Sequence, residues 1–291
     1  MGRLDGKVAV VSGAGRGIGR GEALLLASEG ASVVVNDVDR DAAQAVVDEI
    51  AAAGGKGLAN ADDVSTWSGG ADLVRTAVEE LGGLDVLVNN AGILRDAMSF
   101  NVDEGSWDAV IAVHLKGHAA PTRAAAAHWR ERSKAGEVVS GRIINTSSEA
   151  GLFGNAGQLN YAAAKAGIAS MALVLARELG RYGVTANAIV PRARTRMTED
   201  LLGLPEPAEG FDRWHPDNIA PVVAWLATDA AAHVTGQVFF VFGGRVHVLQ
   251  GWATAGTLER NERWTAAGLE EHADELFGDR DTGVPPFGIG A

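Results

Sequence analysis

Short runs rich in β-branched residues alternate along this chain with longer helical stretches. The short runs predict strands at 8–11, 32–36, 57–59, 86–88, 142–146, 185–189 and 237–241. The longer stretches predict helices at about 17–30, 41–53, 66–81, 103–132, 158–180 and 216–228. Strands that alternate with helices in this way are typical of βαβ units around a parallel sheet.

This order of elements indicates the fold class. Parallel strands need crossover helices, and such crossovers are almost always right-handed. We therefore expect an α/β protein of the Rossmann type, with a doubly wound, seven-stranded parallel sheet between two layers of helices, a three-layer αβα arrangement. A length of 291 residues fits a single domain of this kind.

The repeating pattern stops near residue 244. Residues 1–244 are therefore predicted to form the main domain, and 245–291 an extension packed on the same domain. One more helix is expected at 265–277. Residues 279–291 are rich in Gly and Pro, so the last residues are expected to be mobile.

Composition narrows the classes of partner. The net charge is −12, so the chain lacks the basic footprint of a protein that binds nucleic acid or anionic lipid. It contains no cysteine, which excludes disulfides and thiolate chemistry. The N-terminus has no apolar signal segment, and we expect no run to reach the roughly 20 apolar residues of a membrane span. A cytoplasmic protein without a membrane partner is predicted.

A glycine-rich turn follows the first strand. Its sequence, Ser12-Gly13-Ala14-Gly15-Arg16-Gly17-Ile18-Gly19, opens a predicted helix. Glycines allow the backbone to turn sharply and to approach a pyrophosphate at the helix N-terminus, where N–H groups are unpaired. Such a turn is weak evidence alone, but its place between a strand and a helix strengthens it. The candidate cofactor contacts are Ser12, Gly13, Arg16, Gly17, Ile18 and Gly19.

Asp37 bears on which dinucleotide binds. It ends the second predicted strand, 18 positions after Gly19. A carboxylate there accepts hydrogen bonds from the ribose hydroxyls and repels a 2′-phosphate, which favours NAD over NADP. Two observations point the other way: Asp37 can be a solvated residue at a helix start, and Arg16 can reach a 2′-phosphate.

Two further loops fall at the same edge of the predicted sheet, where ligands bind in open α/β folds. Asp63-Val64 follows the third strand and can meet an adenine ring. Asn89-Asn90-Ala91-Gly92 follows the fourth. These loops add Asp63, Val64, Asn90, Ala91 and Gly92 to the candidate cofactor contacts.

Tyr161 and Lys165 are the candidate catalytic pair. They stand four apart at the start of an Ala-rich helix, so they share one face. A cation beside a phenol favours the phenolate and lowers its pKa. Ser148, 13 residues upstream of Tyr161 at the end of the fifth strand, can hold a substrate oxygen.

These motifs, in this order, resemble the short-chain dehydrogenase/reductase family from about residue 4 to 244. The resemblance implies that Tyr161 is the general acid/base, that Ser148 polarises the substrate oxygen, and that Tyr161 and Lys165 also contact the cofactor, Lys165 at the nicotinamide ribose. It further implies that Pro191 and Thr195 lie in the loop that meets the nicotinamide. His114 stands where many members carry an Asn of a proton relay, and it is predicted to replace that Asn or to be a buried structural histidine.

A narrower likeness is to the (3R)-hydroxyacyl-CoA dehydrogenase unit of multifunctional β-oxidation enzymes and to related actinobacterial enzymes of steroid or acyl-CoA catabolism. It rests on Asn90 to Asp96, Val113 to Gly117, the stretch from Ser148 to Lys165, Arg196-Met197-Thr198, and Val241 to Arg245 with the later Gly251-Trp252. It implies a CoA-linked or steroid-derived hydroxy substrate.

Two features depart from the family pattern. Pro191 is followed by Arg192, and Arg194 and Arg196 come soon after. These arginines are candidates for binding CoA phosphates or a substrate carboxylate, or they face solvent. Glu149, directly after Ser148, can pair with one of them or restrict the pocket.

The sequence therefore predicts an NAD-dependent oxidoreductase of lipid catabolism that moves a hydride between NAD(H) and a secondary alcohol or ketone. An NADPH-dependent 3-oxoacyl-carrier-protein reductase and a catalytically silent nucleotide-binding protein stay open as alternatives. A small-molecule or CoA-linked substrate is the expected partner, and no metal is expected because hydride transfer needs none. The resemblance implies a homodimer or homotetramer built on the helices at 103–132 and 158–180.

Overall fold

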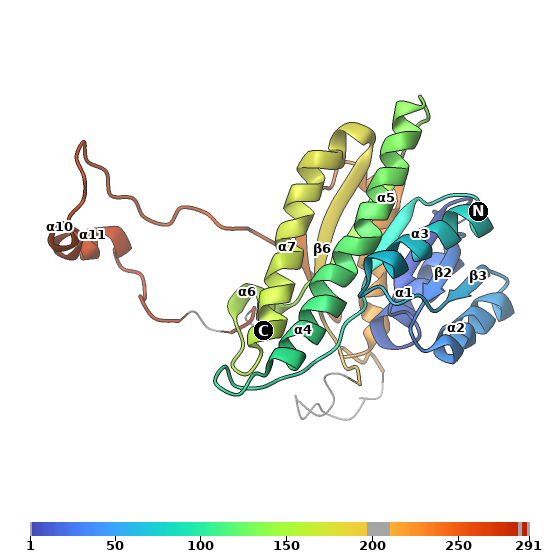
Figure 1. Cartoon of the computed structure of the whole chain (residues 1–291), viewed down its shortest axis with the longest axis horizontal. Coiled ribbons are helices and arrows are strands. Elements are labelled where there is room, and N and C mark those ends of the chain that lie inside the picture. The colour runs from blue at the N-terminus through green and yellow to red at the C-terminus, as the bar shows by residue number, and fades with distance from the viewer. Residues whose placement is uncertain (1, 197–209, 285–286, 290–291) are drawn as a thin grey trace.

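The computed structural model describes residues 2–196, 210–284 and 287–289, and its centre is a twisted sheet flanked by helices (Figure 1). Within these residues the sheet has eight strands in the order β3-β2-β1-β4-β5-β6-β7-β8. Their bounds are β1 (Val8–Ser12), β2 (Ser32–Asn36), β3 (Lys56–Asn60), β4 (Val86–Asn89), β5 (Gly141–Thr146), β6 (Val184–Arg192), β7 (Val238–Phe242) and β8 (Arg245–Leu249).

The seven predicted parallel strands are confirmed, and the order reverses between β1 and β4, as in a doubly wound fold. The count differs, because β8 pairs antiparallel with β7. Sequence reasoning missed β8 because its valines, Val246 and Val248, are exposed, so the strand has no buried apolar run. The predicted domain end at 244 thus falls inside a hairpin.

The helices cover both faces of the sheet. Their bounds are α1 (Gly17–Ser28), α2 (Arg40–Ala52), α3 (Trp67–Leu81), α4 (Glu104–Ile111), α5 (Gly117–Lys134), α6 (Glu149–Phe153), α7 (Leu159–Leu179), α9 (Ala220–Ala227), α10 (Ala266–Glu271) and α11 (Ala273–Phe277). Short helical turns lie at η2 (Gly180–Tyr182), η3 (Pro216–Asn218) and η4 (Asp229–Ala231). The single helix predicted at 103–132 is interrupted by a π-helical segment, η1 (Ala112–Lys116).

The strands divide their side chains between two cores. On β1, Ala9 and Val11 pack with α1, α2 and α9, whereas Val8 and Val10 pack with α3, α5 and α7. Strands buried on both faces read as continuous apolar runs, which is why they could be found in the sequence. The three-layer arrangement is confirmed.

Helix α7 has an unusual composition. The stretch Leu159–Tyr182 has a mean hydropathy of 1.4, and by length and composition alone it would span a membrane, contrary to the expectation that no run does so. Core helices pass the same test. In this fold α7 packs on β5 and β6, while Leu173 and Val174 on its outer side stay exposed.

Residues after 249 do not all pack on the main domain, although this was predicted for the extension at 245–291. After β8 the chain forms an arm that carries α10 and α11 away from the sheet (Figure 1). Trp252 on this arm is fully exposed, whereas large aromatic side chains usually pack in a core. The chain then returns, and Ile289 packs against Val190, Phe240 and Phe242. Of the tail expected to be mobile, residues 285–286 and 290–291 lie outside the described residues.

Glu22 is a buried carboxyl group that makes stability depend on pH. It lies in α1 with no exposed surface, and neither carboxylate oxygen has a hydrogen-bond partner among the described residues. Burial raises the pKa of this carboxyl from 4.5 to about 8. Between pH 4.5 and 8 the folded protein therefore holds a proton that the unfolded chain has released, so stability falls as the pH rises through this window.

We expect Glu22→Gln to remove this pH dependence. The stability of the variant should improve relative to the unchanged protein by up to about 1.4 kcal/mol per pH unit between pH 5 and 8. Urea unfolding at several pH values measures it. Glu80→Gln, on the exposed side of α3, is the matched control and should show no such trend. A constant difference between Glu22→Gln and the unchanged protein over this range would contradict the assignment.

Candidate active site

The glycine turn between β1 and α1 is built for close approach. Gly13 has a φ of +61°, and a β-carbon there would lie 2.7 Å from Cα of Ala91. Arg16, at the N-cap of α1, provides no side-chain cap for the first turn. The N–H groups of that turn are therefore available to an anion, as expected for a pyrophosphate site.

Ser12 and Asn90 join this turn to the loop after β4. The Ser12 hydroxyl accepts hydrogen bonds from the backbone N–H groups of Asn90 (3.0 Å) and Ala91 (3.2 Å). In return the Asn90 side-chain amide donates to the carbonyls of Ser12 (3.1 Å) and Gly13 (3.0 Å). The two predicted cofactor loops are thus held as one unit.

Asp37 lies against the glycine turn, as the sequence predicted. Its carboxylate accepts from the N–H of Gly15 at 3.1 Å and from the N–H of Asp39 at 3.0 Å. Arg16, which argued for NADP, instead forms an ion pair with Asp39. Both side chains of this pair are about half exposed, so Arg16 is held near the ribose position with its charge balanced.

The remaining predicted contacts are arranged around the same edge. Thr195 reaches Gly17, since its Cγ2 is 3.7 Å from where a β-carbon on Gly17 would be. Pro191 lies near the end of β6, where it pairs with Val241 of β7. Val64 is buried, whereas the carboxylate of Asp63 faces its own loop and accepts from the N–H of Ser65 at 2.9 Å.

Ser148, Tyr161 and Lys165 converge at the end of β5. The Ser148 hydroxyl caps α6, and its side chain lies beside the Tyr161 phenol. Lys165, one turn after Tyr161 on α7, donates from Nζ to the carbonyl of Thr146 at 2.6 Å. The Nζ atom lies 5.6 Å from the centre of the Tyr161 ring. The three candidate catalytic residues are therefore neighbours.

Burial sets the pKa values of this group. It raises the pKa of Tyr161, while the hydrogen bond with Ser148 lowers it. Burial also lowers the pKa of Lys165 from 10.5 to about 7. The predicted depression of the tyrosine pKa by Lys165 does not dominate, because a low-dielectric site disfavours the charged form of both groups.

His114 comes to the site through the π-helical segment η1. Its ring meets that of Tyr161 edge to face, with the centres 5.1 Å apart, and its Nε2 contacts the backbone of Ile93. Burial lowers the pKa of His114 to about 3, so its ring is neutral. His118 is four residues on and fully buried. In the described part of the chain, no three ligating side chains gather to hold a metal.

The arginines after Pro191 have partners of their own. Arg192 forms two hydrogen bonds with Glu149, and Arg194 contacts Asp212 at 2.7 Å. The pairing of Glu149 was one of the two options that the sequence left open. Arg196 is exposed, and Met197 and Thr198 lie outside the described residues.

Sequence reasoning missed several supporting residues. Gln158 donates to Asp96 at 2.9 Å beside the catalytic helix, and Asn160 donates to the carbonyl of Arg95 at 3.1 Å. The hydroxyl of Ser147 donates to the carbonyl of Lys165 at 2.7 Å. Their closeness in sequence to Ser148 and Tyr161 was the available signal.

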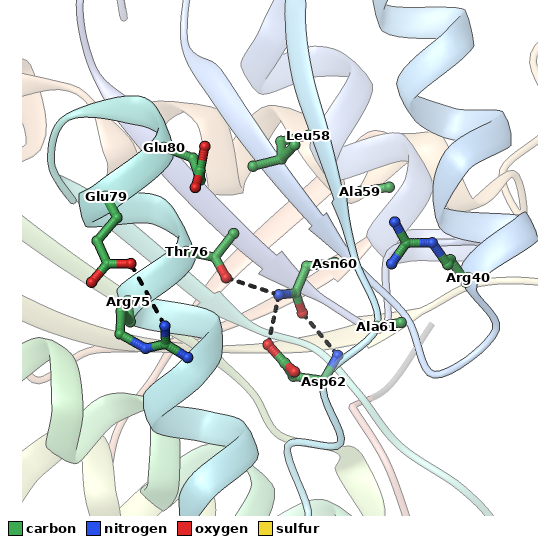
Figure 2. A pocket seen from close by; sticks show the side chains of 10 residues that line it. All are labelled: Arg40, Leu58, Ala59, Asn60, Ala61, Asp62, Arg75, Thr76, Glu79 and Glu80. Carbon is green, nitrogen blue, oxygen red and sulfur yellow. Dashed lines mark hydrogen bonds and ion pairs between the residues drawn. The ribbon is translucent and has the colours of Figure 1, made fainter.

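A cavity of about 460 Å³ lies elsewhere, at the outer edge of the sheet beside β3 (Figure 2). Asn60 bridges Asp62 and Thr76 on its floor, and Arg75 faces Glu79 at 3.6 Å. None of the candidate catalytic or cofactor residues lines it. The cavity therefore lies apart from the candidate active site.

Comparisons with known proteins agree with this geometry. Residues 7–202 match the family described as short chain dehydrogenase. The chain is 50% identical to hydroxyacyl-CoA dehydrogenase ChsB1 of Mycobacterium tuberculosis, over 96% of this chain and 90% of that protein. It is 38% identical to peroxisomal multifunctional enzyme type 2 of Mus musculus, over 94% of this chain but only 37% of that protein. A crystal structure of a short chain dehydrogenase from Mycobacterium avium matches with a TM-score of 0.90 and 53% identity, covering 99% of this chain and all of that one.

Tyr161→Phe tests the acid/base assignment. We expect turnover to fall by about 10²–10⁴-fold, because the phenolate oxygen that accepts the proton is lost, while the affinity for NADH stays within about threefold, since the ring and the glycine turn remain. Turnover is followed by NADH absorbance and binding by NADH fluorescence. Tyr182, the other tyrosine of the chain, gives the matched control Tyr182→Phe. Undiminished turnover in Tyr161→Phe would remove the assignment.

Proposed function

Because the chain belongs to the short-chain dehydrogenase family, we propose that it is an NAD-dependent dehydrogenase that oxidises the secondary alcohol of a 3-hydroxyacyl-CoA or of a steroid-derived substrate. The observation that carries the proposal is the meeting of Ser148, Tyr161 and Lys165 at the edge of the sheet that also holds the glycine turn. A proton acceptor and a dinucleotide cradle at one edge are what hydride transfer from an alcohol requires.

Each residue then has a defined task. Ser148 holds the substrate oxygen by a hydrogen bond, and Tyr161 takes the hydroxyl proton at its phenolic oxygen. When bound, NAD would accept the hydride from the substrate carbon that carries the hydroxyl group. Lys165, fixed to the carbonyl of Thr146, provides positive charge beside the phenolate that accepts the proton. His114, packed on the Tyr161 ring, is proposed to orient it and to take the place of the relay residue.

The preference for NAD is supported by the charges near the ribose position. Asp37 is held at the glycine turn by two backbone N–H groups. A 2′-phosphate would come close to this carboxylate, and Arg16 is already paired with Asp39. Repulsion by the Asp37 carboxylate, with Arg16 engaged by Asp39, disfavours NADP. The same residues argue against the alternative of an NADPH-dependent 3-oxoacyl-carrier-protein reductase.

The substrate class is proposed from the relatives. One relative is a hydroxyacyl-CoA dehydrogenase, and this chain matches 90% of its length. Another is a peroxisomal multifunctional enzyme, and this chain matches 37% of its length. A role in lipid catabolism follows from that likeness. The intact group of Ser148, Tyr161 and Lys165 speaks against a catalytically silent nucleotide-binding protein.

We further propose that the protein assembles as a homodimer or homotetramer. The arm exposes Trp252, and α10 and α11 on it expose Leu269 and Phe277. Leaving large apolar side chains in water is unfavourable, and exposed patches of this kind mark association surfaces. The exposed Leu173 and Val174 on α7 add a second such surface.

An NADH-absorbance screen tests the proposed function. We expect turnover of a 3-hydroxyacyl-CoA or a hydroxysteroid with NAD, and at least tenfold lower kcat/KM with NADP, since a carboxylate opposes the 2′-phosphate. Simple secondary alcohols should react poorly because they lack the binding energy of a large substrate. Preference for NADPH with 3-oxoacyl thioesters would establish the reductase instead, and no turnover with any substrate would favour the silent protein.

Asp37→Ala is the control for the cofactor assignment. It removes the repelling carboxylate, so the preference for NAD should shrink while the kcat with NAD changes little. An unchanged ratio of kcat/KM for the two cofactors would show that Asp37 does not decide between them.

Light scattering on a sizing column tests the assembly. We expect the unchanged protein to have the mass of two or four chains, and the double variant Trp252→Ser/Phe277→Ser to shift towards a smaller species because the arm loses its apolar contacts. Val138→Ser, at an exposed position on the body of the domain, is the matched control. A single-chain mass for the unchanged protein would contradict the proposal.

A further inference from the structure

Glu149 is a buried carboxylate in the active site that the proposed chemistry does not use. It directly follows Ser148 and is the first residue of α6, with 7% of its surface exposed. A carboxylate in the first turn of a helix is favourable, but this one has lost most of its water. It therefore needs a partner to stay charged in the fold.

Arg192 is that partner, and it arrives from the other side of the site. Its Nε and Nη2 donate to the two carboxylate oxygens of Glu149 at 2.8 and 2.5 Å, a bidentate arrangement. The guanidinium also lies over the rings of Phe240 and Phe242, 5.1 and 5.3 Å from their centres. The head group of Arg192 is thus held by an ion pair and by two aromatic faces.

The tail of the chain closes over this pair. The N–H of Ile289 approaches Oε1 of Glu149 at 3.4 Å, and the Ile289 side chain joins the apolar cluster around Phe240 and Phe242. Gly288 has a φ of +88°, and a β-carbon there would lie 3.0 Å from Oε1 of Glu149 and 3.2 Å from Nη2 of Arg192. Only glycine allows so close an approach without displacement.

The pair therefore connects three segments that are far apart in sequence. Glu149 is bonded to Ser148, which holds the substrate oxygen in the proposed function. Arg192 follows Pro191 and leads to Thr195, which reaches the glycine turn. A shift of either segment would change the distance between the substrate carbon and the cofactor, and misplacement of about 1 Å costs up to about 10²-fold in rate.

We infer that Glu149 and Arg192 are positioning residues, and that the tail at Gly288-Ile289 locks them so that Ser148 and the loop after β6 keep the spacing needed for hydride transfer. This inference rests on the proposed function for its effect on turnover. It also changes the expectation for Arg192, whose charge is engaged by Glu149 and is not open to a phosphate or carboxylate of the substrate.

A double-mutant cycle tests the pair, with 3-hydroxybutyryl-CoA as substrate. Arg192→Met and Glu149→Gln should each lower kcat by about 10-fold or more, while KM for NAD changes less than about threefold, because the nucleotide contacts are untouched. In the double variant the loss should be smaller than the product of the two single losses by about 3–100-fold, since no buried charge is left unpaired. Arg132→Met and Glu137→Gln, in an exposed pair at 2.8 Å, are the matched controls.

Gly288→Val tests the tail without removing it. The side chain would force the tail off the pair, so kcat should fall by about 3–10-fold. Hydrogen exchange over residues 287–289 should become faster in Gly288→Val and in Glu149→Gln, and this readout needs no substrate. It therefore tests the contact even if the unchanged protein fails to oxidise 3-hydroxybutyryl-CoA, an outcome that would count against the proposed function alone.

Three results would overturn the inference. One is unchanged exchange at 287–289 in both variants. Another is a double variant whose loss in kcat equals the product of the single losses. The third is an unaltered kcat in Gly288→Val. If Arg192→Met fails to fold, Gly288→Val and hydrogen exchange in Glu149→Gln still decide the question, because neither variant leaves a buried carboxylate without its arginine.

Discussion

The alignment of the carboxyl ends of the parallel strands is the constraint on which the site depends. Val11 pairs with Val88 across β1 and β4, and Asn89 pairs with Asn145 across β4 and β5. In this register Ser12 at the end of β1, Asn90 after β4 and Ser147-Ser148 after β5 lie at one edge of the sheet. Buried amides reinforce it, since Asn89 donates to Asn145 at 2.9 Å. A slip of one residue would turn each of these side chains to the other face of the sheet.

Burial at this edge has a second consequence. Tyr161 and Lys165 both resist ionisation, because the fold removes water from their charged ends. Electrostatic interactions become stronger in such surroundings, so any charge brought in by a ligand acts strongly on both groups. Glu149 is also buried, and Arg192 pairs with both of its carboxylate oxygens. Three buried polar side chains are accommodated in different ways. Lys165 donates to a backbone carbonyl, the His114 ring stays neutral, and Glu149 forms an ion pair with Arg192.

The sequence could predict what local pattern and spacing determine. Seven strands were found, as was the closeness of Tyr161 to Lys165, because each depends on residues near one another in the chain. The π-helical segment at His114 was missed because its residues have ordinary helical composition, and only the packing of the ring beside Tyr161 reveals it. Strand β8 was missed because an exposed edge strand has no buried apolar run. The arm was missed because several of its large apolar side chains, such as Trp252 and Phe277, stay exposed.

The least predictable contacts are also those that separate this chain from a generic member of its family. Residue 149 meets residue 192 and then residue 289, and no periodicity links such distant positions. Such a contact requires the completed sheet, since Glu149 follows β5, Arg192 ends β6, and Phe240 and Phe242 on β7 pack against the arginine. The residues proposed to carry out the reaction therefore lie in short sequence motifs. The shape of the substrate side depends instead on contacts that exist only after β5, β6 and β7 have paired, so it is there that substrate choice can change while Tyr161 and Lys165 remain.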